Sequence, residues 1–529
     1  MATATLPEQE YRGKHERPAR EQAECGRARS GTREACEFPG GALSGMLDAM
    51  NLVERFFAVA ADDPHRVALA TLHRTVTYGE LSDTVRRVSA KLIRAGLKSG
   101  DVAAVSVRPE LEPVFILALM QLGVTSFTAT RRTLEAAGER VDCVIAEAGM
   151  GVHPQVSVDE TFFEQLGSVA PLEDVAELRS TDPVRIVFSS GTTGAPKGVP
   201  FDSASLELRI AAAYETWYAE QSVHCTMGID SISGYMVLLV DLLGGGRYTP
   251  PGPLVERPAL LAQERTRVLY ASVAQFADIV DAIESSGDGT LLSRLALERI
   301  EVAGSLMPPA LIERTHRVFG MWPSCLYGST ESGPIARGEL RPERPFHLGP
   351  LQPGIELQIV DDHGLQVAEG DVGAIRVRRS KMPTGYWPEN RSAAGSGFHD
   401  GWFYPGDRAH LDPDGSLVLD GREGDVVNLS GVKLNLSQLD VWLSELPFAA
   451  DAASVSFTNS LGEPRLVVAF VANEAVNPGR AQRAVARVVG TATVSAVVRV
   501  PQIPRNGLGK VQRDELLIFM RSHLPRLFG

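Results

Sequence analysis

The sequence predicts an α/β protein with a large N-terminal domain of α/β layers, a β subdomain and a small α+β C-terminal domain. Three successive sequence patterns lead to this prediction. Strand and helix patterns alternate as far as about residue 345, which is typical of parallel sheets covered by helices. Short strands separated by Gly and Asp turns follow, as at residues 361–364 and 412–415, and indicate the β subdomain. After about residue 424, a segment of roughly a hundred residues mixes both patterns.

The elements of the α/β part can be assigned in chain order. The first helix is predicted from apolar residues at helical spacing and ends at Gly96. These apolar residues are Leu81, Val85, Val88 and Leu92. Strands are then expected at residues 102–107, 268–271, 300–303 and 325–327, and helices at residues 113–122, 273–284 and from Pro308 onward. This order predicts parallel strands joined by helical crossovers.

Length, charge and cysteine content limit the classes of function. A chain of 529 residues with 44% hydrophobic side chains exceeds one ordinary domain, so two or more domains are expected. A formal net charge of −13 argues against nucleic acid as a partner, because phosphate backbones bind basic surfaces. The five cysteines contain no C-x-x-C pair and suggest neither a zinc site nor a disulfide framework, which fits a reducing cytoplasm.

The N-terminal segment differs from the rest of the chain. Residues 1–45 are crowded with Glu, Arg and Lys and contain few large apolar side chains, so they are predicted to form a disordered tail. This segment lacks the short apolar core of a secretory signal. The chain also lacks the run of about eighteen apolar residues that a membrane helix needs. We therefore expect a cytoplasmic protein with no membrane insertion.

The most informative motif is a loop rich in Gly, Ser and Thr that follows an apolar strand pattern at residues 184–188. Small residues let backbone N–H groups approach an anion, hydroxyls add hydrogen-bond donors, and a lysine adds positive charge. The residues expected to hold phosphate are Ser189, Ser190, Gly191, Thr192, Thr193, Gly194 and Lys197. The spacing differs from that of a nucleoside triphosphatase P-loop, because Lys197 lies between Pro196 and Gly198 and has no Ser or Thr after it.

This loop resembles the signature of the AMP-forming adenylating superfamily, which comprises acyl- and aryl-CoA ligases, peptide-synthetase adenylation domains and firefly-type luciferases. Four more segments resemble that family in the same order, at residues 327–331, 401–407, 420–433 and 501–513. The resemblance covers roughly residues 50–525. It implies an N-terminal adenylate-forming domain at residues 46–423 and a mobile C-terminal lid domain at residues 424–529.

The first of these segments implies a site for adenine and magnesium. By the resemblance, the ring of Tyr327 packs against adenine and the Thr330 hydroxyl bonds the α-phosphate. Glu331 is expected to hold Mg²⁺, a cation that prefers oxygen ligands. The other residues expected beside ATP or AMP here are Gly304, Ser305, Gly328 and Ser329.

The next two segments imply a ribose contact and a hinge. Asp407 is expected to accept hydrogen bonds from both ribose hydroxyls, because a carboxylate offers several acceptor sites. Pro405 stands where the family usually has Thr. Arg422 matches an arginine that reaches ribose and phosphate, and Gly424 stands at the hinge position, which is usually Asp or Lys. Gly431 falls where the resembling CoA ligases leave a backbone gap for the pantetheine arm.

The last segment implies the catalytic lysine. Lys510 matches a family lysine that bridges the substrate carboxylate and the α-phosphate, and such a charge stabilises developing negative charge. With Thr330 and Glu331 it completes the expected catalytic set. We expect Lys510 to be a surface charge of the lid.

The acid substrate is less well defined. The resemblance implies an acyl pocket that draws on Asp230, Gly234, Tyr235 and Ala303. Asp230 stands about where amino-acid-activating domains place an Asp that pairs with the substrate ammonium, yet some acyl-activating relatives carry an Asp nearby without that use. His224, close to this segment, is expected to be structural. An uncharged acyl or aryl acid is favoured, and an amino acid stays open.

The resemblance therefore implies ATP-dependent activation of a carboxylic acid as acyl-AMP, with release of pyrophosphate. A phosphopantetheine thiol, on CoA or on an acyl or peptidyl carrier protein, then attacks the mixed anhydride and releases AMP. ATP and Mg²⁺ are the implied cofactors. Two alternatives remain: an amino-acid-activating adenylation enzyme and a non-catalytic nucleotide-binding relative. The full set of motif residues argues against the second, because a binding protein has no use for all of them.

Overall fold

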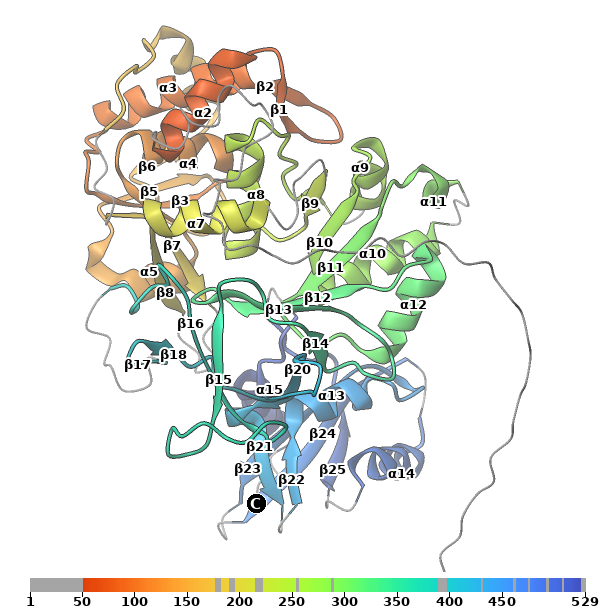
Figure 1. Ribbon diagram of the computed structural model, residues 1–529. Helices are drawn as coiled ribbons and strands as arrows, with labels where there is room; N and C mark the ends of the chain where they lie inside the picture. Colours follow the sequence, from red (N-terminus) through yellow and green to blue (C-terminus); the bar gives the residue numbers. More distant parts are fainter. Residues whose placement is uncertain are drawn as a thin grey trace, which may run out of the picture. The chain divides into compact units, whose positions relative to one another are not determined.

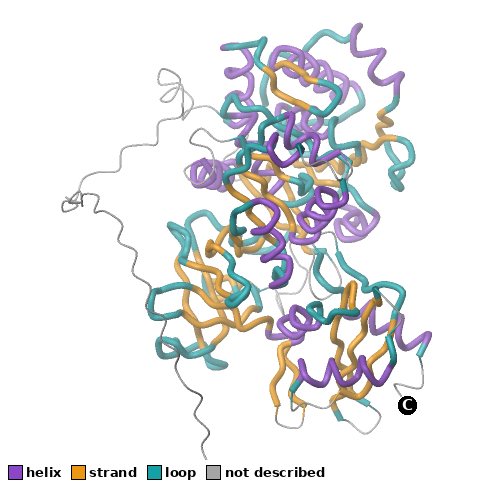
Figure 2. Tube along the Cα trace, turned by 90° about the vertical axis from the view of Figure 1, so that its right-hand side faces the viewer, coloured by secondary structure: helices purple, strands orange, loops and turns teal. Residues whose placement is uncertain are grey.

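The computed structural model describes most of the chain beyond residue 50. The described residues are 51–176, 182–189, 196–214, 222–253, 256–286, 290–388, 397–429, 432–459, 463–473, 476–490, 494–506 and 509–524. The predicted tail at residues 1–45 lies outside them. Figure 1 labels the elements, and Figure 2 shows strands gathered into sheets with helices beside them.

The first sheet has six strands in the order β6-β5-β3-β4-β7-β8. The strands are β3 (Val102–Ser106), β4 (Thr125–Thr128), β5 (Cys143–Glu147), β6 (Val156–Val158), β7 (Pro183–Ser189) and β8 (Lys197–Asp202). All neighbours pair parallel except β7 and β8, which flank the predicted phosphate loop and pair antiparallel. The helices of this part are α2 (Leu52–Asp62), α3 (Tyr78–Arg94), α4 (Glu112–Gln121), α5 (Arg131–Ala137), α6 (Glu160–Glu164) and α7 (Ser203–Ala213). A small hairpin, β1 (Val67–Ala70) with β2 (Thr75–Thr77), completes it.

Local signals set the ends of α3, the first helix predicted from the sequence. Thr77 and Glu80 form a capping box, in which each side chain accepts a hydrogen bond from the other residue's backbone N–H. Leu81, Val85, Val88 and Leu92 are all buried on one face, as the helical spacing predicts. Gly96 follows with a φ of +102°, a conformation that a side chain would strain, and the helix ends before it.

The second sheet has five strands in the order β13-β12-β11-β10-β9. The strands are β9 (Val223–Cys225), β10 (Val268–Ser272), β11 (Arg299–Ala303), β12 (Ser324–Ser329) and β13 (Gly333–Glu339). β9 to β12 pair parallel, and β13 returns antiparallel beside β12. The accompanying helices are α8 (Ile232–Leu243), α9 (Arg257–Gln263), α10 (Val273–Ser285), α11 (Leu291–Arg294) and α12 (Pro309–Phe319). The predicted helices at residues 273–284 and after Pro308 are confirmed by α10 and α12.

The β subdomain is an antiparallel sheet of seven strands in which β15 pairs with β16 beside the path β14-β20-β19-β16-β18-β17. Its strands are β14 (His347–Gly349), β15 (Glu356–Val360), β16 (Gly373–Arg378), β17 (Phe398–His399), β18 (Trp402–Phe403), β19 (Asp407–Leu411) and β20 (Leu417–Arg422). This confirms the short-strand pattern, and thus the β subdomain, that the sequence predicts after residue 345.

The C-terminal part begins with a short 3-10 turn, η5 (Glu423–Asp425), and the hairpin β21 (Val426–Leu429) with β22 (Val432–Asn435). A three-stranded sheet follows, formed by β23 (Ala449–Thr458), β24 (Pro464–Ala472) and β25 (Val494–Arg499). Its helices are α13 (Leu436–Leu443), α14 (Pro478–Val489) and α15 (Arg513–His523). The mixture matches the predicted α+β composition, and the boundary between residues 423 and 424 stays a prediction.

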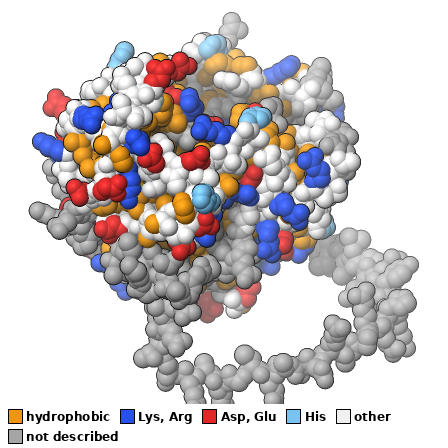
Figure 3. All heavy atoms as spheres, turned by 90° about the horizontal axis from the view of Figure 1, so that it is seen from above, with side chains coloured by type: hydrophobic (Ala, Val, Ile, Leu, Met, Phe, Trp, Pro, Cys, Tyr) orange, Lys and Arg blue, Asp and Glu red, His pale blue; other side chains and the backbone are white. Residues whose placement is uncertain are grey.

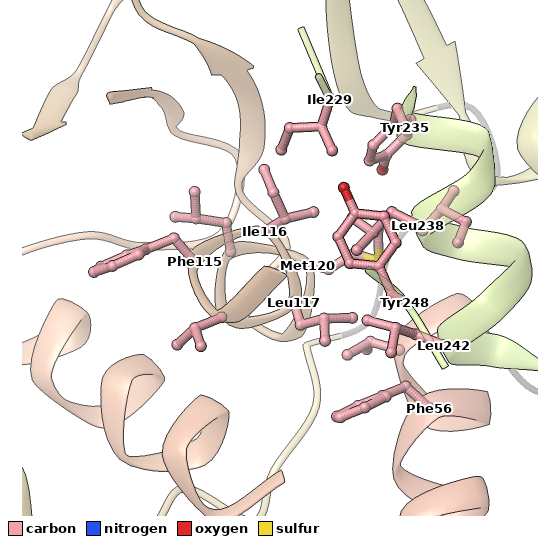
Figure 4. Packing of buried hydrophobic residues seen from close by; sticks show 14 of the residues in the cluster. Phe56, Phe115, Ile116, Leu117, Met120, Ile229, Tyr235, Leu238, Leu242 and Tyr248 are labelled. Carbon is pink, nitrogen blue, oxygen red and sulfur yellow. The ribbon is translucent and has the colours of Figure 1, made fainter. Parts of the chain in front are cut away.

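The core of the α/β part packs α4 against α8. Every residue from Pro113 to Gln121 is buried, so α4 has no solvent face. Figure 4 shows Met120 of α4 near Leu238 of α8, with Phe56 of α2 in the same cluster. This packing fixes α8, whose first turn carries Gly234 and Tyr235, against the core of the α/β part.

The surface carries charges of both signs. On the face in Figure 3, acidic and basic side chains of the described residues are interspersed. Among the described helices, none combines the length and apolar character that crossing a membrane requires.

Candidate active site

Tyr327, Asp407 and Arg422 meet in one hydrogen-bonded cluster. The Tyr327 hydroxyl donates to Asp407 Oδ2 at 2.6 Å, and Arg422 Nε donates to Asp407 Oδ1 at 3.0 Å. Strand pairing fixes the second contact, because Asp407 of β19 lies opposite Arg422 of β20. Each carboxylate oxygen of Asp407 accepts one hydrogen bond here and can accept more, so the ribose contact expected from the sequence stays chemically possible.

Burial and charge shape the protonation states of this cluster. Burial raises the pKa of Tyr327 well above its usual value, and the charge of Asp407 adds to the effect. For Arg422, burial acts to lower the pKa, but the charge and hydrogen bond of Asp407 outweigh it and the pKa rises. The tyrosine therefore stays a donor and the arginine stays charged across the neutral range.

Lys510 lies in the loop between β25 and α15, in the electrostatic neighbourhood of this cluster. The loop is held locally, since Lys510 N donates to Asn506 Oδ1 at 3.0 Å and Arg505 Nη1 donates to the Gly509 carbonyl at 2.7 Å. Gly509 has a φ of +81°, and an added Cβ would lie 2.9 Å from the Cβ of Ala274 in α10. The lysine loop is thus packed tightly on α10, at a position that only glycine fits.

The environment of Lys510 corrects the expectation of a lid-surface charge. The residue is half-buried, and burial lowers the pKa of Lys510, with the positive charge of Arg422 next in importance. Asp407, Glu331 and Asp425 oppose this decrease. The lysine is desolvated because its loop lies against α10 and not in open solvent.

Glu331 is buried in the turn between β12 and β13, and side chains from two other segments fix that turn. The Tyr386 hydroxyl donates to Glu331 Oε1 at 2.8 Å. Arg209 Nη2 donates to the carbonyls of Glu331 and Thr330 at 2.9 and 3.3 Å. Arg379 Nη1 donates to the Ser332 carbonyl at 3.2 Å. Burial, together with the neighbouring charge of Arg379, lowers the pKa of Arg209 to about 9.

The donor set at this turn fits a magnesium ion. The Glu331 carboxylate is a hard oxygen ligand, and the Thr330 side chain supplies an oxygen in the adjacent position. Magnesium usually takes one or two carboxylates together with phosphate oxygens and waters. Nearby, Ser329 Oγ and Ser332 Oγ share a hydrogen bond of 3.0 Å that closes the turn.

The phosphate loop is described at both ends. Ser189 of β7 pairs with Lys197 of β8, and the Ser189 hydroxyl lies 3.4 Å from the Lys197 carbonyl oxygen. Lys197 Nζ lies 5.0 Å from the ring centroid of Tyr386, which places it beside the Glu331 turn. The remaining predicted loop residues lie outside the described residues; they are Ser190, Gly191, Thr192, Thr193 and Gly194.

The predicted adenine side consists of backbone at the ends of β11 and β12. Gly304, directly after β11, has a φ of +94°, and Ser305 follows it half-buried. Gly328 lies in β12, where an added Cβ would come within 2.3 Å of the Gly333 carbonyl oxygen. The β12–β13 hairpin can therefore close this tightly only with glycine at this position.

The four predicted acyl-pocket residues differ widely in exposure. Asp230 is exposed in the turn before α8, and Ala303 is half-buried at the end of β11. Gly234 packs against the preceding loop, because an added Cβ would lie 2.3 Å from the carbonyl oxygens of Met227 and Gly228. Tyr235 is fully buried, so in this structure its side chain belongs to the core and does not line an open surface.

A buried arginine, Arg185, packs against the ring of Tyr235. Arg185 of β7 is fully buried, and its guanidinium lies 5.1 Å from the Tyr235 ring centroid. Arg185 Nη2 donates to Thr128 Oγ1 at 2.7 Å and to the Ile229 carbonyl at 3.0 Å. Burial lowers the pKa of Arg185, and Tyr235, Glu112 and Asp230 act in the opposite direction. This cation therefore fixes the loop that carries Asp230.

His224, which the sequence analysis treats as structural, is also buried. Burial lowers the pKa of His224 to about 4, so the ring is neutral at physiological pH. Neither ring nitrogen has a hydrogen-bond partner among the described residues.

At the predicted hinge, Gly424 lies in the turn η5, and no atom lies within 4 Å of an added Cβ. Asp425, the next residue, accepts a hydrogen bond from Arg513 Nε at 3.3 Å, and Arg513 Nη1 donates to Asp440 Oδ2 at 2.7 Å. Gly431 lies outside the described residues.

Comparison with known proteins identifies the family. Residues 56–387, more than half of the chain, match the family described as AMP-binding enzyme. The chain belongs to this family. Pyochelin synthase PchD of Pseudomonas aeruginosa is 28% identical over 94% of this AMP-binding enzyme and 98% of PchD. 4-coumarate–CoA ligase 3 of Oryza sativa subsp. japonica is 26% identical over 90% of this chain and 94% of the ligase.

A solved structure shows the same fold. ATP-bound MatB from Rhodopseudomonas palustris matches with a TM-score of 0.75 at 20% identity, covering 89% of this AMP-binding enzyme and 99% of MatB. The family match includes the predicted phosphate loop, Tyr327 and Glu331. Asp407, Arg422 and Lys510 lie beyond residue 387; Asp407 contacts Tyr327 and Arg422, and the charges of Asp407 and Arg422 act on Lys510.

Sequence reasoning about this AMP-binding enzyme missed four residues that shape the site: Arg185, Arg209, Arg379 and Tyr386. Arg185 carried a signal, because one arginine interrupts the apolar strand pattern at residues 184–188. The other three stand in unremarkable local sequence. Their roles come from contacts with residues distant in the chain, which no local pattern reveals.

Proposed function

We propose that this AMP-binding enzyme activates a carboxylic acid with ATP as acyl-AMP and then transfers the acyl group to a phosphopantetheine thiol. The observation that supports this best is that Lys510 interacts electrostatically with Arg422, Asp407 and Glu331, although the four residues come from four separate motif segments. A nucleotide-binding protein without chemistry does not need a desolvated lysine beside a ribose-binding carboxylate and a metal-binding carboxylate.

The proposed roles follow from the chemistry of each group. Asp407 accepts hydrogen bonds from the ribose hydroxyls, while Tyr327 and Arg422 hold its carboxylate in place. The Tyr327 ring also faces adenine, with Gly304, Ser305, Gly328 and Ser329 beside it. The phosphate loop, from Ser189 to Lys197, and the Thr330 hydroxyl take the phosphates. Mg²⁺ bound at Glu331 would supply charge neutralisation at the phosphate oxygens.

In the first step, an oxygen of the substrate carboxylate attacks the α-phosphorus of ATP. The bond between the α-phosphorus and the bridging oxygen breaks, and pyrophosphate leaves with the electron pair. Lys510, placed between the carboxylate and the α-phosphate, stabilises the charge that is redistributed. In the second step, a thiolate attacks the acyl carbon, the bond to the AMP oxygen breaks, and AMP leaves.

A rotation of residues 424–529 against residues 46–423 would separate these steps. The charges of Arg422 and Asp407 both act on Lys510, which supports an arrangement suited to the first step. The thiol needs access to the acyl carbon once the lysine loop leaves α10. Gly424 has open space around its Cα and can change φ and ψ freely, which suits a hinge. In this proposal Gly431 lies along the path of the pantetheine arm.

The acid is proposed to be an uncharged acyl or aryl acid, bound near Asp230, Gly234, Tyr235 and Ala303. Asp230 already has the charge of Arg185 nearby, and Arg185 donates to the carbonyl of the adjacent Ile229. A substrate ammonium at Asp230 would therefore meet a buried cation of the same sign, which disfavours it. The name of 4-coumarate–CoA ligase 3 supports CoA as the acceptor, and a carrier protein stays the alternative.

A screen for acid-dependent pyrophosphate release tests the proposal. Purified protein with Mg²⁺ and ATP is offered fatty, aryl and amino acids in turn, followed by CoA or a carrier protein with its phosphopantetheine arm. We expect pyrophosphate release with an acyl or aryl acid and thioester formation with one acceptor. Nucleotide binding without pyrophosphate release for any acid class would contradict the proposal and favour a non-catalytic relative. Release with amino acids alone would favour the amino-acid-activating alternative.

A further inference from the structure

Tyr386 contacts both the predicted metal carboxylate and the predicted phosphate-loop lysine, although it belongs to neither motif. Its hydroxyl donates to Glu331 Oε1 at 2.8 Å. The face of its ring lies 5.0 Å from Lys197 Nζ, within the range of a cation–π interaction. We infer that Tyr386 is a positioning residue that keeps Glu331 and Lys197 at a fixed spacing, so that both can contact magnesium-bound ATP. This inference rests on the proposed function, because it assigns both partners to the ATP site.

The backbone next to Tyr386 is anchored to the strand that carries Lys197. Trp387 N donates to the Gly198 carbonyl at 2.7 Å, and the two residues form an isolated β-bridge. An added Cβ at Gly198 would come within 2.7 Å of the Trp387 carbonyl oxygen, so this approach requires glycine. The Trp387 ring packs on Phe188 of β7, with ring centroids 6.4 Å apart. Tyr386 is therefore fixed relative to both strands of the phosphate loop.

The hydroxyl of Tyr386 has a specific consequence for Glu331. Within the described part of the chain, it is the hydrogen-bond partner of the Glu331 carboxylate. One carboxylate oxygen is thus occupied and oriented, which leaves the other oxygen to face a cation. Arg209 and Arg379 bind the backbone carbonyls of the same turn, so they hold the turn while Tyr386 orients the side chain. Removing an outer partner of a metal ligand typically lowers metal affinity by about 10- to 100-fold.

Tyr386→Phe separates this role from simple packing, because it deletes the hydroxyl and keeps the ring beside Lys197 and Phe398. Tyr404→Phe is the matched control. It also removes a tyrosine hydroxyl from the β subdomain, one that accepts a hydrogen bond from Arg376 Nη1 at 3.1 Å, whereas the Tyr386 hydroxyl donates to Glu331. Mn²⁺ serves as the probe: its binding to the protein with ATP, in the absence of any acid, is measured by the loss of free-ion paramagnetic resonance signal.

We expect Tyr386→Phe to weaken Mn²⁺ binding in the presence of ATP by about 10-fold, while its metal-free ATP affinity and melting temperature stay close to wild type. Tyr404→Phe should behave as wild type. Equal Mn²⁺ affinity in wild type and Tyr386→Phe would overturn the inference, and so would an equal loss in Tyr404→Phe. A wild type that binds Mn²⁺ with ATP but releases no pyrophosphate with any acid would refute the proposed function alone.

Tyr386→Leu tests the second contact, since it removes the ring as well. The loss of the cation–π contact with Lys197 should reduce metal-free ATP affinity by a few fold relative to Tyr386→Phe. An unchanged metal-free affinity in a folded Tyr386→Leu protein would show that the ring does not position Lys197. The link between the two motifs would then be refuted, even if the hydroxyl supports Glu331.

Discussion

Asp407→Asn removes the negative charge that pairs with Arg422 at 3.0 Å. The pair is well shielded, since 10% of the Asp407 side chain and 29% of the Arg422 side chain are exposed. At 3.0 Å and an effective dielectric constant of about 20, Coulomb's law gives roughly 5 kcal/mol for two unit charges. Asparagine keeps a hydrogen bond to Arg422, and partial exposure screens the rest, so the expected loss of stability is about 2 to 3 kcal/mol.

The same substitution should weaken nucleotide binding. If Asp407 binds both ribose hydroxyls, replacing a charged acceptor by a neutral one affects bonds worth about 1.5 to 3 kcal/mol, which corresponds to roughly 10- to 100-fold in AMP affinity. Repulsion between Arg422 and Lys510 would also grow, because the charge of Arg422 already lowers the pKa of Lys510 and Asp407 opposes that effect. Stability is measured as the first transition in urea unfolding, and AMP affinity by titration calorimetry.

Asp412→Asn is the comparison variant, because Asp412 pairs with Arg344 at 2.7 Å just beyond the end of β19, where 25% of the Asp412 side chain and 57% of the Arg344 side chain are exposed. Water screens this pair more than the Asp407 pair, so its loss should cost less, at most about 1 kcal/mol. If Asp407→Asn proves as mild as Asp412→Asn, the cluster is not desolvated and the reasoning fails. If it destabilises the fold but leaves AMP affinity intact, Asp407 is structural and the ribose contact is refuted.

Further predictions concern four residues: Lys510, Gly424, Asp230 and Glu112. Lys510→Ala should slow acyl-AMP formation by about 10²- to 10³-fold. Burial lowers the pKa of Lys510 below 10.5, so the wild-type rate of acyl-AMP formation should fall with rising pH before pH 10.5 is reached. In Lys510→Arg the same fall should occur at a higher pH. Pyrophosphate release measured across pH tests both expectations. Gly424→Pro should slow thioester formation more than acyl-AMP formation, with Gly424→Ala as a control that meets no atom within 4 Å; equal losses in the two half-reactions would contradict a hinge. Asp230→Asn should leave affinity for an uncharged acid nearly unchanged, whereas a loss of roughly 3 to 5 kcal/mol would reveal a substrate ammonium. Burial raises the pKa of Glu112 to about 8. The protonated carboxyl therefore contributes its full stability below about pH 4.5, and this stability is lost as pH rises through 8. The melting temperature of Glu112→Gln should lack this pH dependence.

Much of the fold can be predicted because the signals are local. The spacing of Leu81, Val85 and Val88 places them on one helix face, and Gly96 stops that helix through its positive φ. The alternation of strands and helices before residue 345 and the short antiparallel strands after it also follow from local periodicity. Such patterns depend on residues within a few positions of one another, which a single sequence displays directly.

For the candidate site too, local sequence motifs can be predicted, whereas contacts between distant residues cannot. The sequence by itself determined the order of its motifs and the residue types that carry charge, such as Lys197, Glu331 and Lys510. Only the tertiary structure decided that the Tyr327 hydroxyl binds Asp407, that Tyr386 orients Glu331, and that Lys510 is desolvated on α10. The physical reason is that a hydrogen bond, a burial or a pKa depends on which groups meet in space. These partners lie far apart in the chain and become neighbours only when the sheets pack together.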